Sequence, residues 1–387
     1  MKFLRHSLLL LACAPLSAPL TVVAQPTVKD EAAAKAGLAA LGTAMQQASA
    51  LETEGRFREA EPLWRDALKQ RQHLLGADSP AMAPGQARLA RNLESQGRYR
   101  DAEPLRRSAL QLLQNDPQSS AELPAAYSAL GYNLTLQGQL SEGATHGYRA
   151  LELLRAAGKD DDLEAAQAMS TVGLMLDKQG RFAEAEPFYR EALTIRQRLL
   201  GEDDLDTATS YNNLGASLSG QGKAEEADPY FRRAFAVRRA NGTVPTMVAQ
   251  NAFNIAFNLG KLKKYEEAQA FYQQSIDLWS STFGANNVQT AAGYNGLGMN
   301  YFLQGRYEEA LPLFRQSRSI REKALGKYHP EVAESYGNLG LTQRALGREK
   351  EARKLIATAL NISERTAGAD HPDTAALRTA LDAPAAE

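Results

Sequence analysis

The sequence contains few of the residues from which catalytic and metal sites are usually built. Cysteine occurs once in 387 residues, at Cys13, and histidine occurs five times. Beyond residue 24 the chain therefore has no thiol, no disulfide and no cysteine-bound metal. The net charge is −1, so no long-range positive field exists to attract nucleic acid or an anionic membrane. No apolar stretch approaches about 20 residues, which predicts that the chain has no transmembrane helix.

Sequence signatures of enzymes are also missing. There is no His-Glu-x-x-His, no Gly-x-Ser-x-Gly and no phosphate-binding loop. His329 and His371 occupy the same position in two linkers, so we interpret them as part of a repeat and not as a metal-binding pair. The acidic run at 158–162 lacks the ligand spacing of a calcium loop and favours a helix start instead. We expect no catalytic residues, no cofactor and no metal site.

The first 24 residues are typical of a secretory signal. A positively charged start is followed by a short apolar segment at 8–16 and by small residues ending at Ala24, where we expect cleavage. An alternative is a lipoprotein, because Leu-Leu-Ala-Cys at 10–13 resembles a lipidation motif and would leave Cys13 acylated. Either interpretation predicts an exported protein, periplasmic or secreted in the first case and lipid-anchored in the second.

A unit of two predicted helices then recurs along the chain, and residues 201–235 show it most clearly. Tyr211, Leu214 and Leu218 form one apolar stripe on its first helix, and Gly222 interrupts the pattern before the second helix. The equivalent turn residues are Gly55, Gly97, Gly138, Gly180, Gly222, Lys263, Gly305 and Gly347, which lie 41 or 42 residues apart. Two helices cannot bury both of their apolar stripes alone, so the pattern predicts an all-α stack of eight units.

Small residues recur at fixed positions of this unit. One column lies seven residues before each turn and consists of Ala48, Ala90, Gly131, Gly173, Gly215, Ala256, Gly298 and Gly340. A glycine inside a helix costs roughly 1 kcal/mol relative to alanine, so a recurrent one needs a steric reason. We expect the backbones of neighbouring helices to approach closely at this column.

These motifs resemble the tetratricopeptide repeat, in the 42-residue form found in kinesin light chains. The matching segments are Asn213-Leu214-Gly215, Asn338-Leu339-Gly340, Glu-Ala-Glu-Pro at 59–62 and 184–187, and Leu-Gly-x-x-His-Pro at 325–330. The resemblance implies a right-handed superhelical α-solenoid of about eight helix-turn-helix repeats plus a C-terminal capping helix, over residues 37–382. A short tether at 25–36, turning helical by Glu31, would precede it, and a frayed tail at 383–387 would follow.

The resemblance also implies that the first helices line a concave groove that binds a peptide or a partner helix. Candidate partner-binding residues on the later first helices are Asn213, Phe253, Asn254, Phe257, Asn295, Met299, Phe302 and Asn338. Asn213, Asn254 and Asn338 share one column and would hydrogen-bond the backbone of a bound peptide, as matching residues do in kinesin light chains, although asparagine is also common at this column in repeats without a ligand. Phe253 and Phe257 have two interpretations, because they either pack against a neighbouring helix or anchor a partner.

Other groove positions and the charged surface follow from the same alignment. In the second repeat Ala87, Arg91 and Glu94 are predicted to face the groove. The pairs Arg232-Arg233 and Arg238-Arg239 are predicted to lie on solvated outer faces of second helices.

We therefore expect a non-catalytic protein-protein interaction scaffold of the bacterial cell envelope. Its partner would be a protein or peptide segment bound in the concave groove, with no nucleic acid involved. The alternative is a structural element of an envelope complex, self-associating or lipid-anchored through Cys13.

Overall fold

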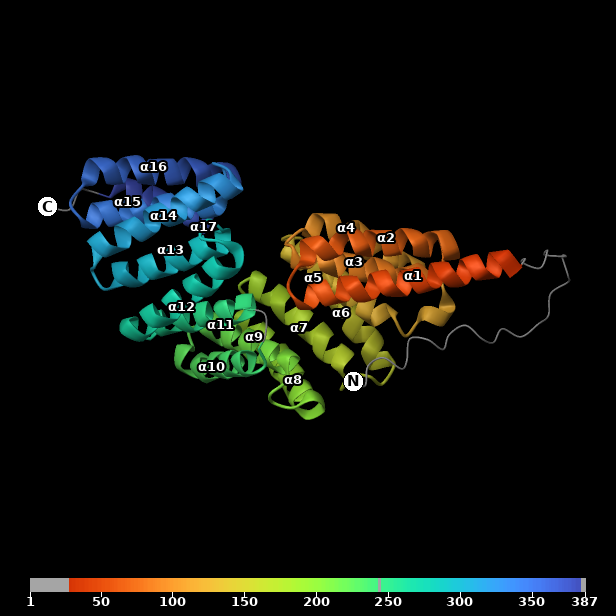
Figure 1. Cartoon of the computed structure of the whole chain (residues 1–387). Helices are drawn as coiled ribbons and strands as arrows, with labels where there is room; N and C mark the ends of the chain where they lie inside the picture. Colours follow the sequence, from red (N-terminus) through yellow and green to blue (C-terminus); the bar gives the residue numbers. More distant parts are fainter. Residues whose placement is uncertain (1–27, 243–244, 384–387) are drawn as a thin grey trace.

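The computed structural model describes residues 28–242 and 245–383, and all regular structure in these residues is helical (Figure 1). The first helices of the repeats are α1 (Val28–Thr53), α3 (Ala83–Ser95), α5 (Leu123–Leu136), α7 (Leu163–Lys178), α9 (Leu205–Gly220), α11 (Pro245–Lys261), α13 (Val288–Leu303) and α15 (Pro330–Ala345). The second helices are α2 (Phe57–Leu75), α4 (Tyr99–Gln114), α6 (Leu140–Ala156), α8 (Phe182–Leu200), α10 (Ala224–Ala240), α12 (Tyr265–Phe283), α14 (Tyr307–Leu325) and α16 (Glu349–Thr366). A last helix, α17 (Pro372–Asp382), packs on α16, and two short 3₁₀ helices, η1 (Pro80–Met82) and η2 (Pro117–Ser119), lie in linkers. The predicted all-α class, with eight helix pairs and a terminal helix, is confirmed.

Each pair is closed by the turn residue on which the repeats were aligned. Seven of the eight turns have a glycine with φ between 73° and 82°, and the eighth has Lys263 with φ of 58°. In this left-handed region glycine has no steric penalty, whereas a side chain is disfavoured. The backbone conformation of the turn therefore explains why glycine recurs at this position. Lys263 is the one turn residue of the eight that adopts it at a steric cost.

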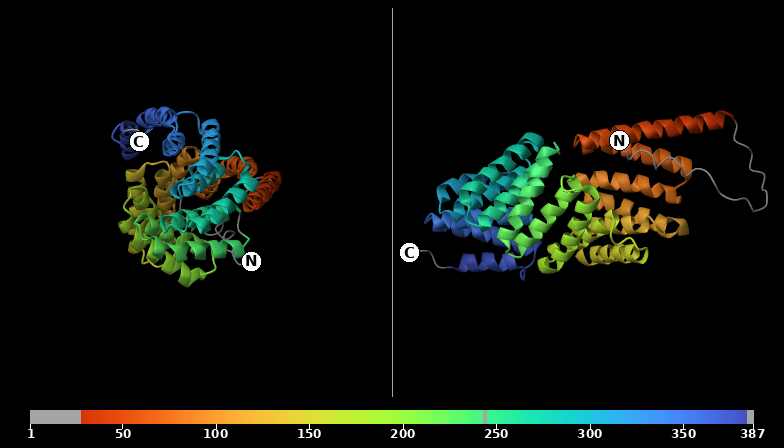
Figure 2. Two further views of the ribbon diagram at one scale, coloured as in Figure 1. Left: turned by 90° about the vertical axis from the view of Figure 1, so that its left-hand side faces the viewer. Right: turned by 90° about the horizontal axis from the view of Figure 1, so that it is seen from below.

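The pairs stack so that each helix contacts mainly its own partner and the adjacent repeat. Figure 1 shows the stack curving from the red and orange N-terminal helices, through the green ones, to the blue C-terminal helices. Figure 2 shows the same layers from below and along the stack, where the chain winds around. Such an arrangement has no single central core, and its stability is a sum of neighbour contacts.

The small-residue column has a different steric reason from the one expected. A Cβ placed on Gly173 would lie 2.8 Å from the ring of Tyr189, and one on Gly215 would lie 3.0 Å from the ring of Phe231. The glycine thus makes room for a large side chain, nine residues past the turn, on the second helix of the same repeat. Backbones approach closely at Gly131, where the added Cβ would lie 3.0 Å from the carbonyl oxygen of Gly143, and at Gly340, where it would lie 3.1 Å from the backbone nitrogen of Ile356.

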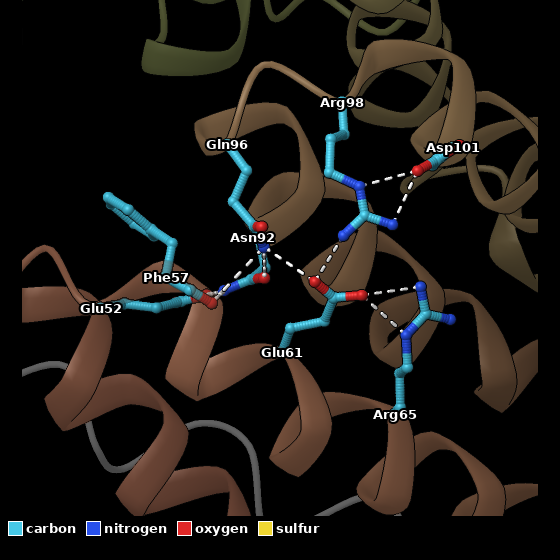
Figure 3. A network of polar contacts seen from close by, with 8 residues as sticks. All are labelled: Glu52, Phe57, Glu61, Arg65, Asn92, Gln96, Arg98 and Asp101. Carbon is cyan, nitrogen blue, oxygen red and sulfur yellow. Dashed lines mark hydrogen bonds and ion pairs between the residues drawn. The ribbon is translucent and has the colours of Figure 1, made fainter. Parts of the chain in front are cut away.

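Buried amides join adjacent repeats, and Figure 3 shows the first such joint. The Nδ2 of Asn92, on α3, donates to the carbonyl oxygen of Phe57 at 3.1 Å, at the first residue of α2. Equivalent bonds to the first residue of the preceding second helix come from Asn133, Asn258 and Asn300. All four of these asparagines are at most 2% exposed. These asparagines share one column of the repeat, five residues before the turn.

The same joint has an exposed ionic part. Glu61 on α2 receives hydrogen bonds from Gln96 (3.1 Å) and Arg98 (2.6 Å) of the next repeat and pairs with Arg65 on its own helix (Figure 3). The three donors hold the pKa of Glu61 below its ordinary value, against the opposing effect of burial. Exposed ion pairs contribute little to stability, so the buried amide is the stronger connection.

The prediction that Arg238 lies on a solvated outer face is wrong. Arg238 is only 5% exposed and donates to Asn251 Oδ1 at 2.7 Å and to Thr209 Oγ1 at 3.0 Å, both on first helices. Burial without a carboxylate partner lowers its pKa to about 10. Arg196 and Arg321, at the same repeat position, are buried in the same way. A long cationic side chain here reaches into the joint between repeats, while Arg239 remains exposed.

Linker residues cap the helices that follow them, and for the acidic run this agrees with the predicted helix start. Asp162 accepts a hydrogen bond from the Ala165 amide at 2.9 Å, so the acidic run ends in a helix cap and not in a calcium loop. The Nδ1 atoms of His329 and His371 each accept a backbone N–H two residues later. Both histidines are thus helix caps.

The ends of the chain fall partly outside the described residues. The predicted signal at 1–24, Cys13 and residues 25–27 of the expected tether are not covered, and neither are residues 384–387 of the expected tail. Helix α1 begins at Val28, three residues before the expected Glu31, and α17 ends at Asp382. Within the described ranges no helix is long and apolar enough to cross a membrane.

Candidate functional site

Two hollows open between first helices, and both are lined mainly by those helices. We call hollow A the space of about 660 Å³ bordered by α3, α4, α5 and α7. Hollow B is a space of about 750 Å³ bordered by α9, α11, α13 and α15, with second-helix residues beneath. Each is large enough to receive several side chains of a partner or a drug-sized ligand.

Hollow B contains five of the eight candidate residues. Phe253, Asn254, Phe257, Asn295 and Met299 line it. Asn338 borders it indirectly, by donating to Asn295 Oδ1 at 3.0 Å. Asn213 and Phe302 are not among its lining residues; Phe302 is half-buried and its ring lies 5.2 Å from that of Tyr307.

Phe253 and Phe257, for which the sequence allowed two interpretations, have different environments in the structure. The ring of Phe253 lies 5.5 Å from that of Tyr272 and 5.7 Å from that of Trp279, both on α12, so Phe253 packs between helices. Phe257, one turn later, is 51% exposed. The Nζ of Lys261 lies 4.9 Å from the centre of its ring. Phe253 thus forms part of the wall, whereas Phe257 presents its ring to the open space.

The two asparagines that line hollow B are each hydrogen-bonded to a side chain of an adjacent repeat. Asn254 donates to Asn212 Oδ1 at 2.8 Å and accepts from Gln250. Asn295 donates to Glu334 Oε1 at 3.0 Å. Each amide group can still form one more hydrogen bond at its nitrogen and at its oxygen. These hydrogen bonds therefore fix the orientation of the two amides and leave them able to form hydrogen bonds with a ligand.

Sequence reasoning missed the residues beneath hollow B, because they come from second helices. Phe231 and Tyr272 occupy the position nine residues past the turn, and Arg321 lies further along α14. Arg321 is 4% exposed and donates to Glu334 Oε2 at 3.0 Å and to Ser335 Oγ at 2.9 Å. The large residue that recurs opposite the small column was the available signal.

Of the two cations that line hollow B, Lys261 forms no ion pair with a carboxylate of the described residues. Lys261 donates to the carbonyl oxygen of Ser219 at 2.6 Å, and burial lowers its pKa. Burial also raises the pKa of the Tyr272 phenol. The arrangement suits binding by apolar contact and a few fixed polar groups.

Hollow A has different walls. Alanine is its most frequent lining residue, at Ala83, Ala87, Ala109, Ala125, Ala126 and Ala129, and Leu113, Tyr132 and Leu163 add larger apolar side chains. The predicted groove residues Ala87, Arg91 and Glu94 all line it. Glu94 pairs with the buried Arg106 at 2.7 Å and also accepts from Asn133, so this carboxylate belongs to a joint between repeats.

Among the described residues, no group of three or more His, Cys, Asp or Glu side chains is arranged to hold a metal ion.

Comparison with known proteins identifies the repeat. The chain matches the tetratricopeptide repeat family over residues 40–115, 122–198, 166–240, 246–323, 289–357 and 331–381. A search of curated proteins found no match.

Solved structures share the fold at low sequence identity. BtubC (BKLC) from P. vanneervenii is 24% identical with a TM-score of 0.50, covering 60% of this chain and 94% of its own. Aspartyl phosphate phosphatase F from Bacillus subtilis is 15% identical with a TM-score of 0.56, covering 78% and 77%. A Rap protein complexed with Competence and Sporulation Factor is 15% identical with a TM-score of 0.53, covering 90% and 97%. The helix pairs, their turns and the family match together show that the chain belongs to the tetratricopeptide repeat family.

Proposed function

We propose that the protein is a non-catalytic scaffold that binds a segment of another protein in its groove, with an apolar side chain of that segment covering Phe257 in hollow B. The observation that carries this proposal is the exposed ring of Phe257 at the edge of a space of about 750 Å³. Fully burying a phenylalanine contributes roughly 1.5–3 kcal/mol. Phe257 is already about half-buried, so covering the rest of its ring would contribute roughly half of that value, which corresponds to an increase in affinity of about three- to tenfold.

The surroundings of Phe257 favour a peptide or helix over a small polar ligand. Phe182, Phe231 and Met299 supply further apolar surface, while Asn254 and Asn295 offer the remaining donors and acceptors of their amides. Extended segments are recognised in this way, by apolar anchors together with backbone hydrogen bonds. The tetratricopeptide repeat is a protein-interaction repeat. The Rap protein named above, which has a similar fold, was solved as a complex with Competence and Sporulation Factor.

The cellular location is a separate part of the proposal. The N-terminal sequence supports export to the bacterial cell envelope with cleavage after Ala24, and the alternative is a lipoprotein anchored at Cys13. Mass measurement of the protein isolated from its host distinguishes a chain that starts at Gln25 from an acylated one. Light scattering of the same sample tests the alternative role as a self-associating structural element.

A photo-crosslinking amino acid at position 257 tests the binding site directly. Introduced into the protein in its host, it should capture a partner segment, whereas the same group at Phe283 should not. Phe283 is the matched control, because it is 48% exposed but lies at the end of α12 and does not line hollow B.

Single substitutions then separate binding from folding. Phe257→Ala should weaken binding of the captured partner about threefold or more with an unchanged melting temperature. Phe253→Ala should lower the melting temperature, because Phe253 packs against Tyr272 and Trp279. Unchanged affinity in the Phe257→Ala protein would remove the support for this site.

A further inference from the structure

Arg71 occupies a repeat position at which other arginines are hydrogen-bonded to the following repeat. Sixteen residues past the turn, the second helices of four repeats carry arginine, at Arg71, Arg196, Arg238 and Arg321. The last three each donate to a side-chain oxygen of the next first helix, which belongs to Ser210, Asn251 and Ser335 respectively. These three acceptors share one position, twelve residues before the next turn.

The residues that would accept from Arg71 are both replaced by glycine. Gly85 stands at the shared acceptor position, so α3 offers Arg71 no side-chain oxygen there. The first helix of the arginine's own repeat supplies a second acceptor elsewhere, since Gln167 accepts from Arg196 at 3.1 Å and Thr209 accepts from Arg238 at 3.0 Å. The equivalent residue of the first repeat is Gly42. Arg71 therefore has the position of the other arginines without their acceptors.

One hydrogen bond holds Arg71 in place and leaves most of its donors free. Its Nε donates to the carbonyl oxygen of Ala81 at 2.7 Å. Its two terminal NH₂ groups have no acceptor among the described residues. The side chain is half-buried and packs over Gly85, whose Cβ position lies 3.3 Å from Arg71 Cδ. The guanidinium is thus fixed in position while four N–H donors remain available to a ligand.

A second cation lies beside Arg71. Arg88 follows Gly85 by one turn of α3, and its guanidinium carbon lies 5.6 Å from the centre of the Trp64 ring. Burial and the positive charge of Arg88 both lower the pKa of Arg71. Neither arginine forms an ion pair with a carboxylate of the described residues. Two neighbouring cations without a counter-ion repel each other, so an added anion would stabilise both.

Both arginines line one small space, which we call the Arg71 pocket. It has a volume of about 30 Å³ and is bordered by α1, α2 and α3, with Trp64 and Gly85 among its lining residues. The surroundings of Gly42 are open, because no atom lies within 4 Å of its Cβ position. A space of this size admits the tip of a side chain and excludes a whole cofactor.

We propose that the Arg71 pocket binds the carboxylate of an aspartate or glutamate side chain of a partner protein, held by Arg71 and Arg88. A carboxylate presents two acceptor oxygens, and guanidinium groups donate to both. The chain contains a precedent, because Arg321, at the repeat position of Arg71, pairs with Glu331 at 3.1 Å and with Glu334 at 3.0 Å. The Arg71 pocket shares no lining residue with hollow B, so this proposal does not depend on Phe257.

Fluorine NMR of the full chain labelled with 5-fluorotryptophan tests the pocket. Of the two tryptophans, Trp64 lines it, whereas Trp279 is equally buried on α12 and is the internal control. The probe is N-acetylglutamate α-amide, and its neutral isostere, N-acetylglutamine α-amide, is the matched ligand. At constant ionic strength the acid should shift the Trp64 signal in a saturable manner and leave the Trp279 signal unchanged. The neutral compound should shift neither signal.

Substitutions identify the groups responsible. Arg71→Gln should raise the dissociation constant of the acid about fivefold or more, and Arg88→Gln about threefold or more. Arg58→Gln removes an exposed cation of α2 that has no ion pair among the described residues, and this control should change nothing.

A further pair of variants fills the pocket from within. Gly42→Gln restores the acceptor that Gln167 provides in the fourth repeat, so it should compete with the acid for Arg71 and weaken binding. Gly42→Ala adds no acceptor and should leave the affinity unchanged. Both variants should be at least as stable as the wild-type protein, because glycine is unfavourable inside a helix and the site is open.

Four results would overturn the proposal. Equal shifts of Trp64 by the acid and by its neutral isostere would show that the pocket does not select a charge. Tighter binding of inorganic phosphate than of the acid would assign the pocket to phosphate and not to a carboxylate. Shifts that persist in the folded Arg71→Gln and Arg88→Gln proteins would assign the binding to other groups. An unshifted Trp64 signal would show that the two arginines are not available, whatever the outcome at Phe257.

Discussion

The side-chain amide of Asn92 donates to the carboxylate of Glu52 across the joint between the first two repeats, with 2.7 Å between Nδ2 and Oε1. Trp64 donates its indole N–H to the same oxygen at 2.8 Å. Asn92 and Trp64 are 0% and 3% exposed. One carboxylate thus connects the second helix of its own repeat to the first helix of the next.

Removing the amide should weaken this joint. Asn92→Ala leaves Glu52 and the carbonyl of Phe57 with fewer donors in a buried place, at a cost of about 1–3 kcal/mol. Amide hydrogen exchange should accelerate in α1 to α4 more than elsewhere, because each repeat relies on its neighbours. Asn361→Ala, at an exposed position of α16, is the control. Equal exchange rates in the Asn92→Ala and wild-type proteins would contradict the assignment.

The glycine beside Tyr189 should not tolerate a methyl group. Gly173→Ala would place a Cβ 2.8 Å from a ring that is 1% exposed and has no free space to move into. Overpacking of this kind costs about 1–3 kcal/mol. Gly260→Ala is the comparison, because no atom lies within 4 Å of its Cβ and alanine favours the helix by about 0.5–1 kcal/mol. Thermal unfolding should move in opposite directions for the two variants, and a common direction would refute this explanation.

Replacing Lys263 by glycine should stabilise the protein. It adopts a φ of 58°, where the seven equivalent turns have glycine. Lys263→Gly should therefore raise the free energy of unfolding by about 1 kcal/mol. The reciprocal change Gly222→Lys should lower it by a similar amount, since no atom lies within 4 Å of the Cβ position and only the backbone is affected. Denaturant unfolding measures both, and a destabilised Lys263→Gly protein would be the contrary result.

Asp177 should make stability depend on pH. Burial raises its pKa from 3.8 to about 6, although a hydrogen bond from Ser217 at 3.0 Å lowers it. The folded state therefore holds this proton more tightly than the unfolded state. The contribution to stability is full below about pH 4 and is lost as the pH rises through about 6.

Asp177→Asn tests that sign. The variant keeps an oxygen that can accept from Ser217 but does not titrate. Its melting temperature should exceed that of the wild-type protein at pH 7, and the difference should diminish towards pH 4. An identical pH profile for both proteins would show that Asp177 is not responsible.

The sequence predicted the repeat, its turns and its fold class because these depend on local patterns. A glycine at φ near 75° and an apolar stripe on each first helix can be recognised without any tertiary information. The contacts between repeats could not be predicted in this way. Asn92 and Arg238 are polar residues that the sequence alone would place on the surface, and only the packing of an adjacent repeat against them shows that they are buried.

The candidate site was predictable in its location but not in its detail. The alignment placed Phe253 and Phe257 on one helix, one turn apart, but could not tell which ring would be covered. That depends on Tyr272 and Trp279 of the following helix, which lie against Phe253 and not against Phe257. Three predicted groove residues, Ala87, Arg91 and Glu94, line hollow A, but the alignment did not identify it as a separate hollow, because most of its other lining residues come from three further helices.

Each repeat packs mainly on its neighbours, so the stack can bend at each joint between repeats. A small change of angle at one joint is not resisted by distant contacts, and it displaces everything beyond that joint. A partner held at two places along the inner surface would therefore fix the curvature between them. Binding of the partner would then change the curvature of the whole superhelix, and not only the residues that it contacts.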